Sequence, residues 1–162
     1  MEPYQKSLKG KLKPLICWDI YHAHFQKQHL LQQDLEQILN LVQQHQWQTA
    51  LNFRKLLQEE YTLVVTNPQK EITWVSSGFI DMTGYAPSYA LNKKPGFLQG
   101  PDTDSKMVKM ISAKLAQKEK VSGKLINYRK GGIPYLCGLE IHPLFTSRQQ
   151  FSHFIALEKE IV

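Results

Sequence analysis

The chain has 162 residues, of which 42% are hydrophobic and 21% are charged, and its formal net charge is +6. This length suits one domain, or one domain with an extension, and such a chain needs neither a disulfide nor a metal to fold. No run approaches the ~20 apolar residues of a membrane span, and no apolar signal-peptide core follows the lysine-rich start. We therefore expect a cytoplasmic protein with no membrane partner.

Residues 1–14 form a polar lead that we expect to be a flexible basic tail. Four lysines oppose one glutamate there, so this segment supplies +3 of the net charge. Beyond it, no stripe of lysine and arginine interleaved with aromatic residues appears, and a nucleic-acid partner is not indicated. The two cysteines, Cys17 and Cys137, show neither Cys-x-x-Cys nor metal-site spacing, so buried thiols are the simplest interpretation.

Residues 15–61 have the pattern of an N-terminal helical extension. The segment contains no proline or glycine, and its apolar residues recur at helical spacing. One run leads to Val42 and another begins at Trp47, with a break near residues 44–46. We predict two or three amphipathic helices, with Asp34 starting or reinforcing the middle one. They would pack on their own sheet or on another subunit.

After Tyr61 the pattern changes to short strands and turns. Two apolar strands flank an Asn-Pro turn and predict a hairpin. Short helical pieces follow, and then a longer helix to about residue 118, capped by Asp102 or Thr103. Three strands follow at about 121–129, 133–143 and 151–157. This order predicts an α+β domain over residues 62–162, with an antiparallel five-stranded sheet and short helices on one face.

Three motifs stand in order within this predicted domain. Residues 77–85 contain Ser-Gly-Phe and then Thr-Gly-Tyr; residues 97–104 read Phe-Leu-Gln-Gly-Pro-Asp-Thr-Asp; residues 127–135 contain Asn-Tyr-Arg-Lys, Gly132 and Pro-Tyr. Together they resemble the PAS domain family over roughly 100 residues, and most closely its light-oxygen-voltage (LOV) photoreceptor subclass. The resemblance implies the PAS fold, with a space between the inner sheet face and the short helices.

Most LOV residues that hold flavin or react with it are replaced in this chain. The resemblance places Pro95 at the position of the reactive cysteine, Gly96 at that of a phosphate-pairing arginine and Ser112 at that of a second. Proline has no nucleophile that could form a flavin adduct, and a flavin phosphate is held mainly by guanidinium groups. We therefore expect no FMN cofactor and no LOV photochemistry.

Four residues are the candidate lining of a small-molecule pocket: Gln99, Asn127, Cys137 and Glu158. The resemblance retains Gln99 and Asn127, whereas Cys137 replaces a flavin-contacting asparagine and Glu158 replaces a signal-relaying glutamine. Strand alternation points Asn127 and Glu158 inward. A carboxylate there must be paired, protonated or hydrated. Glu158 would therefore contact a ligand, with Asn127 and Gln99 beside it, or reach solvent at the strand end.

The same alternation predicts an apolar set on the outer sheet face, formed by Ile126, Tyr128, Leu136, Ile155 and Leu157. A patch of this size is not left in water. The extension supplies apolar stripes to cover it, and their surplus makes a homodimer through this face and the helices the simplest assembly. The alternative is a monomer in which the helices fold back and cover the sheet completely.

No catalytic constellation or metal site appears in the sequence. The chain has no Gly-x-Ser-x-Gly, His-Glu-x-x-His or phosphate loop. We expect a non-catalytic PAS sensory or interaction module that signals through its sheet face and N-terminal helices to a downstream protein. Two alternatives stay open: a PAS sensor for a small ligand other than FMN, and a cysteine-less flavin-binding photoreceptor.

Overall fold

A long helix precedes a mixed domain in the computed structural model of the chain, which describes residues 15–161, with side chains from Trp18 onward. The basic tail predicted for residues 1–14 lies outside them, as does the side chain of Cys17. Helix α1 (Leu15–His45) leads into the short strand β1 (Trp47–Gln48) and helix α2 (Phe53–Gln58). None of the described helices is both long and apolar enough to cross a membrane.

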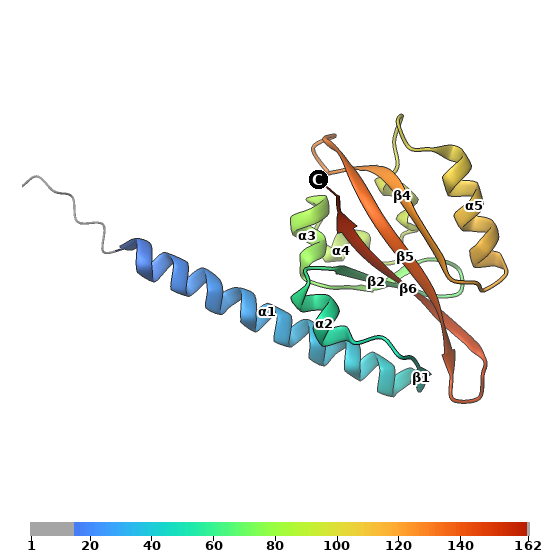
Figure 1. Cartoon of the computed structure of the whole chain (residues 1–162), viewed down its shortest axis with the longest axis horizontal. Helices are drawn as coiled ribbons and strands as arrows, with labels where there is room; N and C mark the ends of the chain where they lie inside the picture. Colours follow the sequence, from blue (N-terminus) through green and yellow to red (C-terminus); the bar gives the residue numbers. More distant parts are fainter. Residues whose placement is uncertain (1–14, 162) are drawn as a thin grey trace, which may run out of the picture.

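The domain itself is an antiparallel sheet with helices against it (Figure 1). Its elements are β2 (Thr62–Thr66), β3 (Ile72–Val75), α3 (Gly78–Thr83), α4 (Pro87–Ala90), the 3-10 helix η1 (Pro95–Leu98), α5 (Ser105–Ala116), β4 (Val121–Tyr128), β5 (Pro134–Thr146) and β6 (Phe151–Glu160). The strands run in the order β3-β2-β6-β5, and β4 and β1 pair with successive parts of the free edge of β5. The predicted α+β class is confirmed, and β1 adds a sixth strand to the five expected.

The extension differs from the two or three helices predicted. It is one 31-residue helix followed by the six-residue α2. The predicted break near residues 44–46 is confirmed, because Gln46 has a left-handed φ of 53°. That turn carries Trp47 to the sheet edge, where it pairs with Thr146 instead of continuing a helix. Its indole nitrogen donates to Ser152 Oγ at 3.0 Å.

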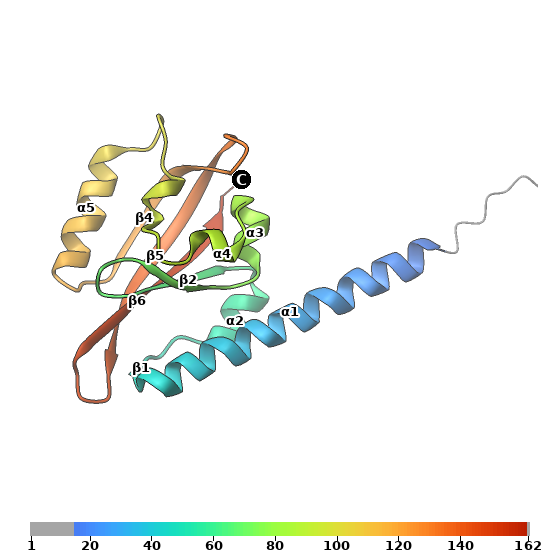
Figure 2. The same cartoon turned by 180° about the vertical axis from the view of Figure 1, so that it is seen from behind.

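The outer sheet face is covered by the extension of the same chain. One buried apolar cluster joins α1, β1 and α2 to the sheet; it contains Leu35, Ile38, Trp47, Phe53, Leu57, Leu63, Val65, Leu144, Ile155 and Leu157. The first half of α1 takes no part in it and extends past the domain, as Figures 1 and 2 show. The helix therefore has a packed half and a projecting half.

This packing places the five predicted interface residues in different surroundings. Ile155 and Leu157 are buried beneath the extension. Ile126 is half-buried, and Tyr128 donates a hydrogen bond to Asp102 Oδ2 at 2.6 Å. Leu136 is exposed. The set does not form one open apolar patch, because the chain covers most of it with its own segments.

Candidate functional site

A cavity of about 210 Å³ lies between the inner face of the sheet and the helices η1 and α5. Much of its wall is aliphatic and comes from the sheet and both helices, including Val64, Leu98, Ile111, Leu125, Leu139 and Ile141. Pockets for drug-sized ligands usually measure ~300–1,000 Å³. The cavity therefore has room for a small molecule with an apolar body.

The structure brings three of the four predicted pocket residues to this cavity. Gln99, Asn127 and Glu158 line it. Pro95, Gly96 and Ser112, the three positions that the LOV resemblance assigned to flavin chemistry, line it as well. Cys137 does not line it. Its side chain is fully buried behind Glu158, with Sγ 3.9 Å from Glu158 Oε2.

Glu158 is the most unusual polar group of the cavity. It is only 7% exposed, so the alternative that it reaches solvent is wrong. The thiol of Cys137 is its hydrogen-bond partner, and no cationic side chain among the described residues forms an ion pair with it. Burial raises the pKa of the Glu158 carboxyl to about 7, and the weak thiol hydrogen bond opposes this only in part. The cavity thus holds an unpaired carboxyl group.

Tyr135 is a buried polar residue whose pKa is influenced by Glu158, although it does not line the cavity itself. Its hydroxyl is buried and makes no hydrogen bond of standard geometry within residues 15–161, although the side chain of Asn127, its partner across β4 and β5, lies beside it. Burial raises the pKa of the Tyr135 hydroxyl, and the charge of Glu158 raises it further. A buried polar group without a partner is rare enough in folded proteins to need an explanation. Polar groups here have hydrogen-bonding capacity that the described chain does not use.

Two lysines line the same cavity from the solvent side. Lys94 is exposed and precedes η1, whereas Lys70 is half-buried and lies in the β2–β3 turn. Lys70 Nζ donates to Ser112 Oγ at 3.4 Å. Lys93, the neighbouring lysine, instead lies over the ring of Tyr89 at 3.0 Å. Sequence reasoning missed Lys70, because it belongs to a turn that carries no motif.

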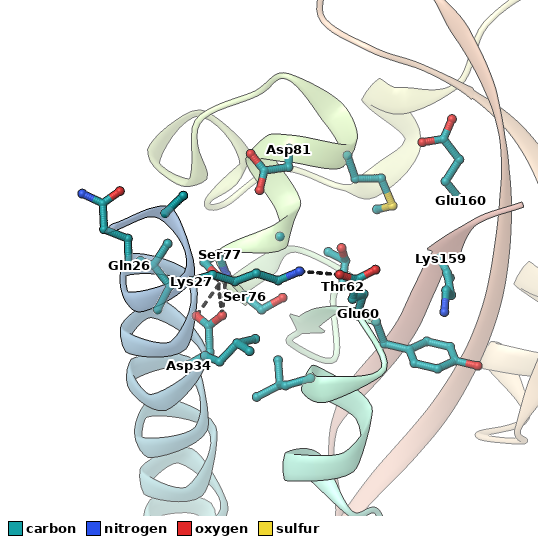
Figure 3. Close-up of a pocket in the computed structure, with 17 residues that line it drawn as sticks. Gln26, Lys27, Asp34, Glu60, Thr62, Ser76, Ser77, Asp81, Lys159 and Glu160 are labelled. Carbon is teal, nitrogen blue, oxygen red and sulfur yellow. Dashed lines mark hydrogen bonds and ion pairs between the residues drawn. The ribbon is translucent and has the colours of Figure 1, made fainter. Parts of the chain in front are cut away.

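A second, open crevice of about 540 Å³ separates α1 from α3 and the end of β6 (Figure 3). Within it the Asp34 carboxylate, 5% exposed, accepts from the backbone N–H of Ser77 at 2.9 Å and from Ser77 Oγ at 2.6 Å. Burial raises the pKa of Asp34, and the hydrogen bonds from Ser77 oppose the rise. Asp34 was predicted to start or reinforce a helix of the extension; it instead lies inside α1 and binds the residue before α3.

Acidic and basic side chains surround this crevice. Figure 3 shows Lys27 of α1 reaching Glu60, which follows α2, in an exposed ion pair. Lys159 and Glu160 of β6 lie on the opposite wall. Within residues 15–161 no group of histidine, cysteine, aspartate and glutamate side chains could hold a metal ion. The crevice is therefore a joint between the extension and the domain, with Asp34 as its buried polar contact.

Comparisons with known proteins relate the chain to sensory domains. Residues 59–162 match the family model described as PAS domain. Phototropin-2 of Oryza sativa subsp. japonica is 35% identical over 96 residues, which are 59% of this chain and 11% of that protein. A blue-light photoreceptor of Listeria monocytogenes is 32% identical over 102 residues, 61% of this chain and 40% of that protein. The chain therefore spans less than half the length of either relative.

A solved structure agrees with these relatives. The light-state structure of the LOV domain of the blue-light photoreceptor Aureochrome1 has a TM-score of 0.62 and 28% identity, over 67% of this chain and 88% of that one.

Proposed function

This chain belongs to the PAS domain family, and we propose that it is a non-catalytic sensory module in signal transduction. The state of its inner cavity is passed to the N-terminal helices, and from them to a downstream signalling protein. One observation carries the proposal: strand β6 faces both regions. Glu158 lines the cavity, while Leu157 and Ile155 pack under α1 and α2. A ligand that shifts β6 would also shift the surface on which the extension rests.

A polar path supports the same coupling. Thr62 of β2 pairs with Glu158 in the sheet. The next residue, Leu63, donates its backbone N–H to Ser76 Oγ at 2.9 Å, and Ser77 donates to Asp34 of α1. A displacement at Glu158 would thus reach α1 through hydrogen bonds as well as through apolar packing.

Filling the cavity should change the stability of α1, and Asp34 should carry part of that change. Ala156→Leu adds volume to the cavity wall, and overpacking of this kind usually costs ~1–3 kcal/mol. In the Ala156→Leu variant, we expect the hydrogen-exchange rates of the backbone amides of residues 31–45 to change several-fold relative to the wild type. This change in exchange rates should be smaller in the double variant Ala156→Leu, Asp34→Asn, because the second substitution weakens the contact between α1 and Ser77.

The matched control is Ala113→Leu, on the exposed side of α5, which should leave exchange in α1 unchanged. If Ala156→Leu alters exchange around the cavity but not in residues 31–45, the extension does not report on the cavity and the proposed function is wrong.

We also propose that this module does not use flavin–cysteine photochemistry. Pro95 lines the cavity where a LOV domain needs a thiol, and neither a cysteine nor an arginine is among the residues around it in the described chain. The volume of about 210 Å³ is also small for a flavin nucleotide. These residues do not fit FMN. A cysteine-less flavoprotein is the second candidate, favoured by the blue-light photoreceptors among the similar proteins and structures.

Purified protein should therefore be colourless. We expect no flavin absorption in the blue after expression with excess riboflavin, and no bleaching under blue light, because Pro95 supplies no nucleophile. Absorption spectra and mass analysis of the denatured supernatant measure this directly. Stoichiometric FMN that survives purification would contradict the expectation and favour the second candidate.

The projecting half of α1 supports the further proposal of a homodimer. Trp18, Tyr21 and Phe25 are 71%, 66% and 61% exposed and recur at helical spacing along one side. Most helical stability in proteins comes from tertiary packing of an apolar face, and clustered exposed aromatic residues indicate an interface. A second copy would bring an identical stripe, as a twofold-symmetric contact requires.

Light scattering should accordingly give twice the chain mass at high micromolar concentration. Replacing Trp18 and Phe25 together by serine should shift the protein to the monomer, because both side chains lie in the proposed contact. Tyr89→Ser, which removes an exposed aromatic ring from the domain itself, should leave the mass unchanged. A monomeric wild-type protein would exclude the dimer.

A further inference from the structure

We propose that the inner cavity binds a small bipolar molecule: a nitrogen base that meets Glu158 at the buried end, an apolar body, and an acidic group that meets Lys70 and Lys94 at the mouth. This inference rests on the proposed sensory function of the same cavity. It differs from the flavin of LOV domains in size and in the charge required at each end.

The buried end requires a cation or a strong hydrogen-bond donor. Glu158 is 7% exposed, and its protein partner is a thiol 3.9 Å away. A carboxylate buried without a counter-ion is costly, and a partner that brings positive charge and N–H donors removes much of that cost. Asn127, 6% exposed, lines the cavity with Glu158. A protonated amine or amidine supplies what this end lacks.

The mouth requires an anion. Lys70 and Lys94 both line the cavity, and neither forms an ion pair with another described residue. The contact of Lys70 with Ser112 is long at 3.4 Å and involves a neutral hydroxyl. Two unpaired ammonium groups on residues that line one cavity suit a carboxylate or a similar acid. An acid placed there leaves the rest of the ligand inside the cavity.

The aliphatic part of the cavity wall limits where the two charges of the ligand can lie. Leu125, Leu139 and Ile141 line the cavity together with Glu158 and the two lysines. A compound that carries both charges on one carbon, as an α-amino acid does, would have to leave one of them among apolar side chains. A compound with its base and its acid at opposite ends of an apolar ring or chain satisfies all three regions. The volume of about 210 Å³ limits it to a single ring or a short chain.

Three probes separate the contributions of the two ends. 4-(Aminomethyl)benzoate carries both charges, 4-methylbenzoate lacks the amine, and benzylamine lacks the carboxylate. Calorimetric titration of the full chain at pH 8 should show the bipolar probe binding at least tenfold more tightly than either half. In Glu158→Gln the bipolar probe should bind no better than 4-methylbenzoate. In the double variant Lys70→Gln, Lys94→Gln it should bind no better than benzylamine.

Glu36→Gln is the control, because it makes the same carboxylate-to-amide change on the exposed side of α1, and it should bind all probes like the wild type. The proposal is overturned if no probe binds at millimolar concentration, if 4-methylbenzoate binds as tightly as the bipolar probe, or if Glu158→Gln preserves the difference. Failure of the proposed function has a different signature: the bipolar probe binds as expected, but hydrogen exchange in residues 31–45 does not change.

Discussion

A chain that begins at residue 61 should aggregate instead of folding. Deleting residues 1–60 removes half of the main buried cluster, namely Leu35, Ile38, Trp47, Phe53 and Leu57. Burial of one large apolar side chain contributes ~1.5–3 kcal/mol, so the loss is on the order of 10 kcal/mol. That equals the whole stability of a typical domain, ~5–15 kcal/mol. The sheet residues Ile155 and Leu157 would then be exposed to water.

A shorter deletion distinguishes this explanation from a general effect of truncation. Removing residues 1–26 takes away the projecting part of α1 but keeps Lys27 and every member of the cluster. This protein should stay soluble, with a thermal midpoint close to that of the full chain. Size-exclusion chromatography and circular dichroism compare the two. A soluble fragment 61–162 with a cooperative melt would show that the extension is dispensable for covering the sheet.

The sheet could be predicted from the sequence because its signals are local. Alternation placed Glu158 and Leu157 on opposite faces, and the structure has one lining the cavity and the other beneath the helices. The extension was predicted less well. A helical pattern in the sequence does not show whether one helix continues or a second one begins. At Gln46, a single residue with left-handed backbone geometry ends α1, and Trp47 then pairs with the sheet as part of a strand. Pairing with Thr146, 99 residues later in the chain by their numbers, leaves no local signal.

The LOV-like motifs predicted the fold correctly, and the structure gives the reason. Several of the retained residues hold the loop before α5 against β4. Thr103 Oγ1 donates to the Ile126 carbonyl at 2.6 Å, and the backbone N–H of Asp102 donates to the Tyr128 hydroxyl at 3.0 Å. A side chain at Gly100 would collide with the Tyr128 ring. These contacts hold the Tyr128 side chain against the loop before α5, so it does not contribute to an open outer face.

The cavity residues could be predicted only where a motif or a strand marked them. Asn127 and Glu158 follow from strand alternation and Gln99 from its motif, and all three line the cavity. Lys70 belongs to the turn between β2 and β3, and Asp34 of α1 accepts a hydrogen bond from Ser77, the residue before α3. Both positions depend on how distant segments pack, so their neighbours in the sequence carry no sign of them.

Glu158→Gln should make the protein more stable above pH 7, by up to about 3 kcal/mol. The folded protein raises the pKa of Glu158 from 4.5 to about 7, so the folded state binds this proton more tightly than the unfolded state. The contribution of Glu158 to the free energy of unfolding is therefore fully present below pH 4.5 and is lost as the pH rises through 7. The magnitude follows from ~1.36 kcal/mol for each tenfold change in proton affinity. Glutamine has a similar shape and does not ionise.

Urea unfolding of both proteins between pH 4 and 8.5 measures the effect. The two stabilities should nearly coincide at pH 4 and separate across pH 5–7, with the variant above the wild type. Glu160→Gln is the opposite control on the same strand, because Arg129 pairs with both Glu160 oxygens at 2.7 Å. That exposed ion pair contributes at most ~1 kcal/mol to the free energy of unfolding. Its loss should therefore destabilise the protein slightly, and the Glu160→Gln variant should not become more stable than the wild type at high pH.

The sign of this result bears on function as well as on stability. A buried carboxylate that weakens the fold at neutral pH has no structural use of its own, and strongly perturbed groups in cavities concentrate at functional sites. Glu158→Gln should therefore gain stability and lose the bipolar probe at once, as is common where a site sacrifices stability for activity. If the variant is instead less stable than the wild type at pH 8, Glu158 already has a favourable partner within the chain, and a ligand base is not needed there.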